Sequence, residues 1–164
     1  MAEPSIFGDK EIAFLEELTK RRVEFIIVGA AAAALQGAPI VTQDVDLWFK
    51  DLGHPGIKRA LAKVGGAMVP PIGLRPPVFA GEAVKLFDIV LTMHGLGSFD
   101  EEKKHTTVVA LGPISVRILN LDRIIKSKET VRRPKDLLII PVLKDALMTI
   151  KSASRHQRKK RKAE

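Results

Sequence analysis

Cysteine is absent from the 164 residues, which excludes disulfide bonds, thiolate metal sites and cysteine nucleophiles. Tyrosine is absent as well, and aromatic residues make up only 5% of the chain, which argues against an RNA-binding surface built on base stacking. No apolar run approaches the length of a membrane span, and residues 1–10 lack the apolar core of a signal peptide. We therefore expect a cytoplasmic protein that makes no membrane contact.

The net charge of +8 is concentrated at the C-terminal end. Residues 151–164 hold seven basic residues and one acidic residue, so they contribute +6 and leave +2 for the rest. The length fits one domain with a sizeable core, which we place at residues 1–150, followed by a basic, disordered tail at 151–164. Such a tail can contact nucleic acid through phosphates, or it can serve only to keep the protein in solution.

Apolar periodicity predicts alternating helices and strands. Helices are expected at residues 10–22, 30–36, 57–64, 121–128, 135–140 and 141–150, and strands at 23–28, 41–49, 84–93, 106–111 and 114–118. The last two strands flank Gly112-Pro113 and are typical of a hairpin. This order predicts an α/β (α+β) fold in which a mixed β-sheet of about five strands is flanked by helices.

Two carboxylates interrupt the apolar strand expected at residues 41–49. Asp44 and Asp46 are two positions apart, so a regular strand would place both on one face. Like charges on an apolar strand are unfavourable unless a cation neutralises them, and Mg²⁺ prefers carboxylate oxygens shared with substrate phosphates. The pair therefore predicts a magnesium site.

Asp88 lies in the middle of another apolar strand, residues 84–93. If this strand lies beside residues 41–49, Asp88 joins Asp44 and Asp46 in a cluster suited to two-metal phosphoryl transfer. Each residue also has a plainer explanation: Asp44 as a turn cap, Asp46 as a lysine partner and Asp88 as a polar residue on an edge strand. The combination favours the metal site.

An anion-binding corner is predicted just upstream. Gly29 separates an apolar strand from an alanine-rich helix, and the backbone N–H groups of Gly29 and Ala30 would face a phosphate at the start of that helix.

These residues resemble the signature of the nucleotidyltransferase superfamily, which has the polymerase-beta-like fold. The resemblance lies in Gly29-Ala30, Ala32, Gly37, Thr42 and Asp44-Val45-Asp46, and in a second segment with Ser127-Lys128 and Arg133-Pro134-Lys135-Asp136. With Asp88, it extends over residues 10–147, and it is strongest to small prokaryotic nucleotidyltransferases related to toxin–antitoxin enzymes. Two positions depart from the family pattern: Ala30 stands where Gly or Ser is usual, and Ile40 where Arg is frequent.

The resemblance implies transfer of a nucleoside monophosphate from an NTP to an acceptor hydroxyl, on the 3′ end of an RNA such as tRNA or on a protein side chain. It implies that Asp44, Asp46 and Asp88 are catalytic and bind two Mg²⁺ ions, and that Gly29, Ala30, Thr42 and Lys128 contact the nucleotide. Arg133 and Lys135 are expected to pair with Asp136 instead. The departures at Ala30 and Ile40 leave open a binding module without turnover, or a regulatory member of a toxin–antitoxin pair.

Overall fold

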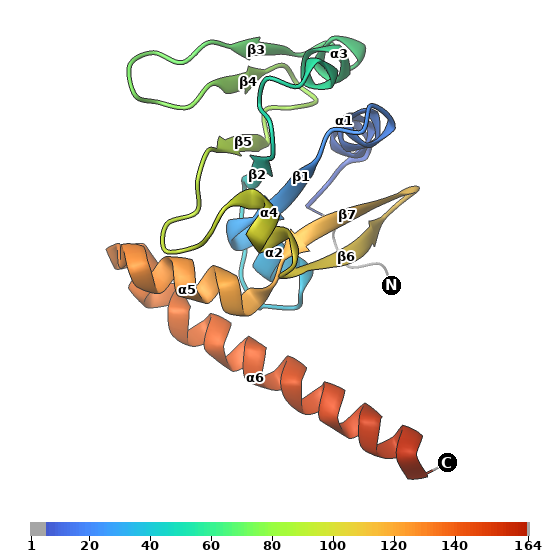
Figure 1. Cartoon of the computed structure of the whole chain (residues 1–164), viewed down its shortest axis with the longest axis vertical. Coiled ribbons are helices and arrows are strands. Elements are labelled where there is room, and N and C mark those ends of the chain that lie inside the picture. The colour runs from blue at the N-terminus through green and yellow to red at the C-terminus, as the bar shows by residue number, and fades with distance from the viewer. Residues whose placement is uncertain (1–5, 164) are drawn as a thin grey trace.

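A mixed five-stranded sheet forms the centre of the molecule in the computed structural model, which describes residues 6–163 (Figure 1). Its strand order is β5-β2-β1-β7-β6, and a separate hairpin pairs β3 with β4. The strands are β1 (Phe25–Val28), β2 (Val45–Phe49), β3 (Ala67–Val69), β4 (Val78–Ala80), β5 (Phe87–Val90), β6 (Thr106–Leu111) and β7 (Ile114–Leu119). The predicted α/β fold with a mixed sheet of five strands is thus confirmed.

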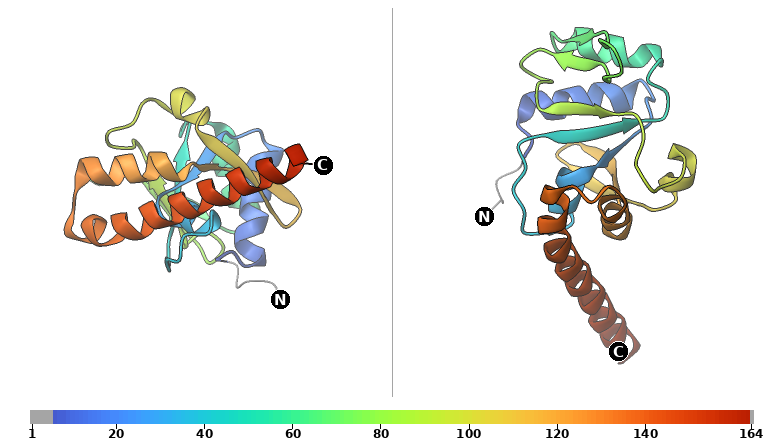
Figure 2. Two further views of the ribbon diagram at one scale, coloured as in Figure 1. Left: turned by 90° about the horizontal axis from the view of Figure 1, so that it is seen from below. Right: turned by 90° about the vertical axis from the view of Figure 1, so that its left-hand side faces the viewer.

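Helices cover both faces of this sheet (Figure 2). They are α1 (Asp9–Lys20), α2 (Gly29–Leu35), α3 (Pro55–Lys63), α4 (Phe99–Lys103), α5 (Leu121–Val131) and α6 (Pro134–Ala163). On one face Phe14 of α1 contacts the ring of Phe87. On the other face Trp48 meets Phe99 of α4 edge-on, with ring centroids 5.5 Å apart. Among the described residues, no helix is long and apolar enough to span a membrane.

The carboxylate strand is shorter than predicted, and this changes the position of Asp44. β2 begins at Val45, so Asp44 precedes it in an exposed loop. The hydroxyl of Thr42 donates to the Asp44 carbonyl at 2.9 Å. This hydrogen bond stabilises a local turn in place of pairing with a neighbouring strand. The expectation that Asp44 and Asp46 share one face of a regular strand is therefore wrong. Similarly, the predicted strand 84–93 is regular only over Phe87–Val90.

The C-terminal segment also differs from the prediction. Residues 151–163 are helical and exposed, and they form the end of α6, which projects from the body in Figures 1 and 2. This part of the chain has strong helix formers and no Gly or Pro, and its basic residues suit the negative end of the helix dipole. Pro141 lies within α6 without ending it, because the carbonyl it leaves unpaired belongs to the exposed residue Leu137.

Gln36 connects three elements that surround the candidate site. Its amide nitrogen donates to the carbonyls of Ala32 in α2 and Leu119 in β7, at 2.9 and 2.8 Å. Its amide oxygen accepts the N–H of Leu121 at 3.1 Å, at the start of α5. One side chain therefore joins the end of α2, the end of β7 and the first turn of α5.

We predict that Gln36→Ala lowers the free energy of unfolding by about 1–3 kcal/mol, because it leaves a half-buried carbonyl and N–H without their partner. Urea denaturation followed by circular dichroism measures the change. Gln157→Ala, on the exposed end of α6, is the matched control and should change stability by less than about 0.5 kcal/mol. Equal stability of the two variants would contradict the bridging role of Gln36.

Candidate active site

Asp46 and Asp88 are direct neighbours on two parallel strands. β2 pairs with β5, and the register places Asp46 opposite Asp88. Side chains opposite each other in a sheet lie on the same face, and neighbouring strands are about 4.8 Å apart. The structure therefore brings together the two carboxylates that are 42 positions apart in the sequence, which is the arrangement that the sequence predicted for them.

Gly29 is required where β1 turns into α2. Its φ of +67° lies in the left-handed region, and a Cβ atom built there would come within 2.5 Å of the Asp46 Oδ2 atom. Any other residue would strain the backbone and force the Asp46 carboxylate to shift. The predicted glycine corner and the Asp46 carboxylate are thus in contact, which places a helix start directly beside the acidic pair.

Asp44 reaches the same group from the loop before β2. Its charge contributes to raising the pKa of both Asp46 and Asp88, so all three carboxylates interact. The side chains of Asp44 and Asp88 are exposed, whereas Asp46 is half-buried.

The pKa of Asp46 is raised above its usual value, chiefly by burial and then by repulsion from Asp88. The charge of Lys128 opposes this, and Lys135 does so more weakly. Burial also raises the pKa of Asp88, with repulsion from Asp44 as the second cause. The nearby lysines therefore do not compensate for the burial and mutual repulsion of these carboxylates. Such a site favours binding of a proton or a cation.

A cavity of about 240 Å³ opens beside Asp46, between the sheet and α5. Gly29 and Lys128, two of the predicted nucleotide contacts, line it together with Asp46. Ala30 and Thr42 are not among its lining residues; Ala30 is half-buried in α2, and Thr42 holds the loop that carries Asp44. The other lining residues are Val28, Val90, Thr92, Met93, His94, Ile124, Ser127, Val131, Arg133 and Asp136.

Lys128 is oriented by a buried acid. Its Nζ atom lies 3.4 Å from Asp136 Oδ1, and Asp136 is only 1% exposed. Arg133 binds the same carboxylate, with its Nε atom 2.9 Å from Oδ2, as the sequence predicted. Hydrogen bonding from Arg133 is the main reason that the pKa of Asp136 is lowered. Within residues 6–163 Lys135 forms no such pair; its side chain is exposed and its charge acts on Asp46.

Sequence reasoning gave no site role to Ser127, which it named only as part of a family match, or to His94, and both line the cavity. The Ser127 side chain is buried and faces the cavity one residue before Lys128, and His94 lies on its rim. Ser127 falls on the inner face of the amphipathic helix α5, together with Ile124 and Leu121, so helical periodicity could have identified its position. His94 follows β5 in an irregular segment and carries no comparable signal.

The carboxylates of Asp44, Asp46 and Asp88 are suited to a hard cation, because hard cations prefer oxygen ligands of this kind. Among residues 6–163, however, no three acidic or histidine side chains are grouped so that they could hold one metal ion together. Asp46 and Asp88 are fixed by the strand register, whereas the exposed side chain of Asp44 has to turn toward them to complete a three-carboxylate site.

Comparison with known proteins finds relatives at the level of fold. No family model matches the chain, and no curated protein matches it by the search criterion. The crystal structure of ANT(2'')-Ia in complex with adenylyl-2''-tobramycin is similar, with a TM-score of 0.56, 14% identity and coverage of 90% of this chain and 95% of that one. A solution structure of the antibiotic-resistance factor ANT(2'')-Ia has a TM-score of 0.52 and 16% identity, and covers 91% and 95%. The chain therefore has a fold similar to that of these ANT(2'')-Ia structures.

We predict that Asp46→Asn raises the free energy of unfolding at pH 7 without metal. The pKa of Asp46 is raised in the folded protein, so ionised Asp46 destabilises the fold above that pKa. The advantage of the variant should shrink as the pH falls and vanish near the ordinary aspartate pKa of about 3.9. Urea denaturation at a series of pH values with EDTA measures it, with Asp145→Asn on the exposed side of α6 as a control for the loss of one charge. A variant less stable than the wild type at pH 7 would contradict the raised pKa of Asp46.

Proposed function

We propose that this protein transfers a nucleoside monophosphate from an NTP to an acceptor hydroxyl in a Mg²⁺-dependent reaction. The observation that carries the proposal is the in-register pair Asp46 and Asp88 beside the Gly29 corner and the cavity with Lys128. A similar fold occurs in ANT(2'')-Ia, whose crystal structure holds an adenylylated product.

Each residue has a role that follows from its position. Asp44, Asp46 and Asp88 would hold two Mg²⁺ ions, which supply positive charge for the polyphosphate and lower the pKa of the acceptor hydroxyl. Asp46 is half-buried and lies against Gly29, so it would act on the nucleotide side of the site. Asp88 is exposed and has a raised pKa, so it can take the acceptor proton as the new oxygen–phosphorus bond forms and pyrophosphate leaves.

The nucleotide would lie in the cavity beside Asp46. The backbone N–H groups of Gly29 and Ala30, at the start of α2, would donate to phosphate oxygens. Lys128 would shift from Asp136 toward the triphosphate, because their separation of 3.4 Å is long for a hydrogen bond and Arg133 already satisfies Asp136. Thr42 contributes by holding the turn that presents Asp44.

A second candidate is a binding module that keeps the fold and the nucleotide site without turnover. Ala30 supplies no hydroxyl at the corner, Ile40 supplies no cation, and the three carboxylates are not gathered at one point among the described residues. This candidate predicts NTP binding with no release of pyrophosphate. A regulatory role in a toxin–antitoxin pair predicts a stable complex with the product of a neighbouring gene, which co-purification from the native host tests.

For the enzyme, we predict that Asp46→Asn and Asp88→Asn each lower pyrophosphate release by at least about a hundredfold, because each removes a metal-binding carboxylate. The assay incubates the protein with Mg²⁺, each labelled NTP and total cell extract as acceptor, and it measures pyrophosphate and labelled product. Asp145→Asn should retain full activity, since its side chain lies on the exposed part of α6. Unchanged turnover in Asp88→Asn would remove Asp88 from the mechanism, and NTP binding without any pyrophosphate would favour the binding module.

We propose RNA as the acceptor partner, on the charge of α6. Its last turns carry Lys151, Arg155, Arg158, Lys159, Lys160, Arg161 and Lys162, all exposed, and in the described residues 151–163 no acidic residue opposes them. The helix lacks aromatic residues in this part, so it would contact phosphates and would not read bases. Seven cations on a projecting helix favour a polyanion over a small neutral acceptor.

We predict that deleting residues 153–164 flattens the salt dependence of RNA affinity. Each phosphate that the arm no longer neutralises should reduce the slope of log affinity against log salt by about 0.7, as for a single-stranded nucleic acid. A full-length variant with the six basic residues after Ser152 replaced by Gln keeps helix propensity and should behave like the deletion. Nucleotide binding should be unchanged in both. Superimposable salt curves for wild type and variants would exclude this arm as an RNA contact.

A further inference from the structure

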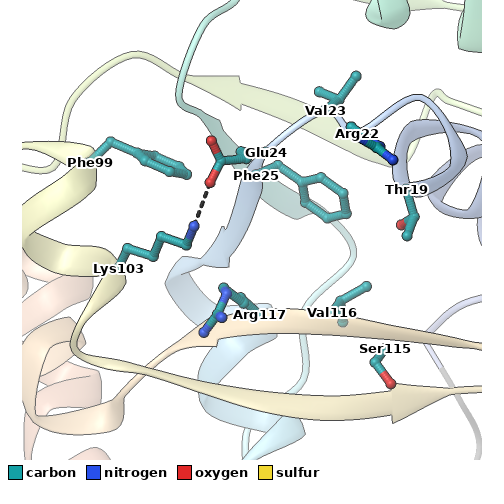
Figure 3. Close-up of a pocket in the computed structure, with 10 residues that line it drawn as sticks. All are labelled: Thr19, Arg22, Val23, Glu24, Phe25, Phe99, Lys103, Ser115, Val116 and Arg117. Atoms are coloured by element: carbon teal, nitrogen blue, oxygen red, sulfur yellow. Dashed lines mark hydrogen bonds and ion pairs between the residues drawn. The ribbon is translucent and has the colours of Figure 1, made fainter.

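A second cavity of about 240 Å³ lies at the other end of β1 from Asp46 (Figure 3). It is lined by four consecutive residues, 22–25, which lead into the start of β1, and by three consecutive residues of β7, 115–117. Consecutive residues of β7 point to opposite faces of the sheet, so a cavity that residues 115–117 all line reaches the edge of this strand, and the segment leading into β1 lies across from it. The cavity is therefore a gap between two strands.

The pairing of β1 with β7 explains why the gap exists. These parallel strands are in register at Ile27 opposite Ile118, whereas β1 matches β2 along its whole length, from Phe25 to Val28. Toward the start of β1 the two strands diverge, as Figure 1 shows. The facing edges of separated strands direct backbone N–H and C=O groups into the gap, where they can bind a ligand.

The gap has apolar walls. Val23, Phe25, Phe99 and Val116 line it, and each is less than 10% exposed. Figure 3 shows the rings of Phe25 and Phe99 on either side of Glu24. An engineered apolar cavity of about 150 Å³ binds benzene, so a space of this volume can accept one or two fused rings.

The rim of the gap is cationic. Arg22, Lys103 and Arg117 line it together with a single carboxylate, Glu24, which already accepts a hydrogen bond from Lys103 at 2.5 Å. Within residues 6–163 Arg22 and Arg117 form no ion pair, and Arg117 donates one hydrogen bond, to the hydroxyl of Thr106 at 3.2 Å. Two guanidinium groups beside an apolar gap suit a planar anion such as a carboxylate.

Arg22 has a left-handed backbone conformation, which is unfavourable for a residue with a side chain. It follows α1 with φ of 56°, where its N–H donates to the Thr19 carbonyl and the N–H of Val23 donates to the Leu18 carbonyl. This is a Schellman ending, in which glycine is the usual residue. A side chain in a left-handed conformation is strained, and such strain is concentrated at functional sites. At Arg22 the strained residue is also a cation on the rim of the cavity.

We propose that the gap between β1 and β7 binds a small organic anion of the aromatic carboxylate class. The rings lie between Phe25, Phe99 and Val116, and the carboxylate faces Arg22 and Arg117. This site is separate from the acidic pair, because it lies at the opposite end of β1 and carries the opposite charge. It does not depend on the proposed transferase activity.

The probe is 2-naphthoate, titrated into full-length protein and followed by calorimetry and by ¹H–¹⁵N NMR, with neutral 2-naphthamide as its uncharged counterpart. We expect saturable binding of naphthoate, weaker binding of naphthamide, and shifts at Phe25, Phe99 and Val116. Trp48, the one tryptophan of the chain, contacts Phe99 edge-on, so its indole N–H signal should move as well. Shifts confined to Asp46 and α5, or no saturable binding, would overturn the proposal.

Three arginine variants separate the anion site from general effects of strain and charge. Arg22→Gly relieves the backbone, so it should raise Tm while weakening naphthoate binding about tenfold, through loss of one charge-assisted hydrogen bond. Arg132→Gly is the matched control: Arg132 has φ of 54° at the end of α5, is exposed and does not line the cavity. It should raise Tm similarly and leave naphthoate affinity unchanged. Arg117→Gln should weaken binding without raising Tm. Equal naphthoate affinity in wild type, Arg22→Gly and Arg117→Gln would refute the site.

Discussion

Burial of the Asp46 carboxylate beside Asp88, together with the repulsion between them, is the constraint around which the centre of this molecule is built. The parallel register of β2 and β5 places them side by side, and partial burial raises the pKa of each. Gly29 leaves room for the Asp46 carboxylate in its present position, and Lys128 adds positive charge from α5. Folding alone does not relieve this repulsion, so the site retains a capacity to bind a cation. A bound cation would convert a destabilising feature into the reactive part of the proposed enzyme.

The elements around this pair fix its surroundings. Asp136 is almost fully buried, yet it is satisfied by Arg133 and lies near Lys128, so the start of α6 is coupled to the cavity beside Asp46. Gln36 joins α2, β7 and α5 and thereby keeps the glycine corner and the lysine helix at a constant separation. The residues that support the site are thus mainly polar groups buried between elements, and their hydrogen bonds set its geometry.

The two ends of β1 carry opposite chemistry. At its C-terminal end the strand passes into Gly29 and the acidic pair, and at its N-terminal end it diverges from β7 beside Arg22 and Arg117. β1 and β7 are paired only at Ile27 and Ile118, so the sheet has an opening beyond this position. Side chains line this opening without filling it. The same short strand therefore supports a cation-binding edge and an opening suited to an anion.

The sequence by itself determined the local features of this protein. Apolar periodicity predicted the alternating helices and strands, and the lone carboxylates in apolar strands, with Gly29 between strand and helix, indicated the acidic site and its corner. These signals are local, since they depend on side-chain spacing and backbone preference. Tertiary structure alone decided the rest. The register that sets Asp46 opposite Asp88 depends on strand order, and the loop position of Asp44 depends on hydrogen bonds with Thr42. The helical end of α6 was missed because its charge outweighed helix propensity in the prediction. The gap at Arg22 results from the divergence of two strands far apart in sequence, and no local pattern encodes it.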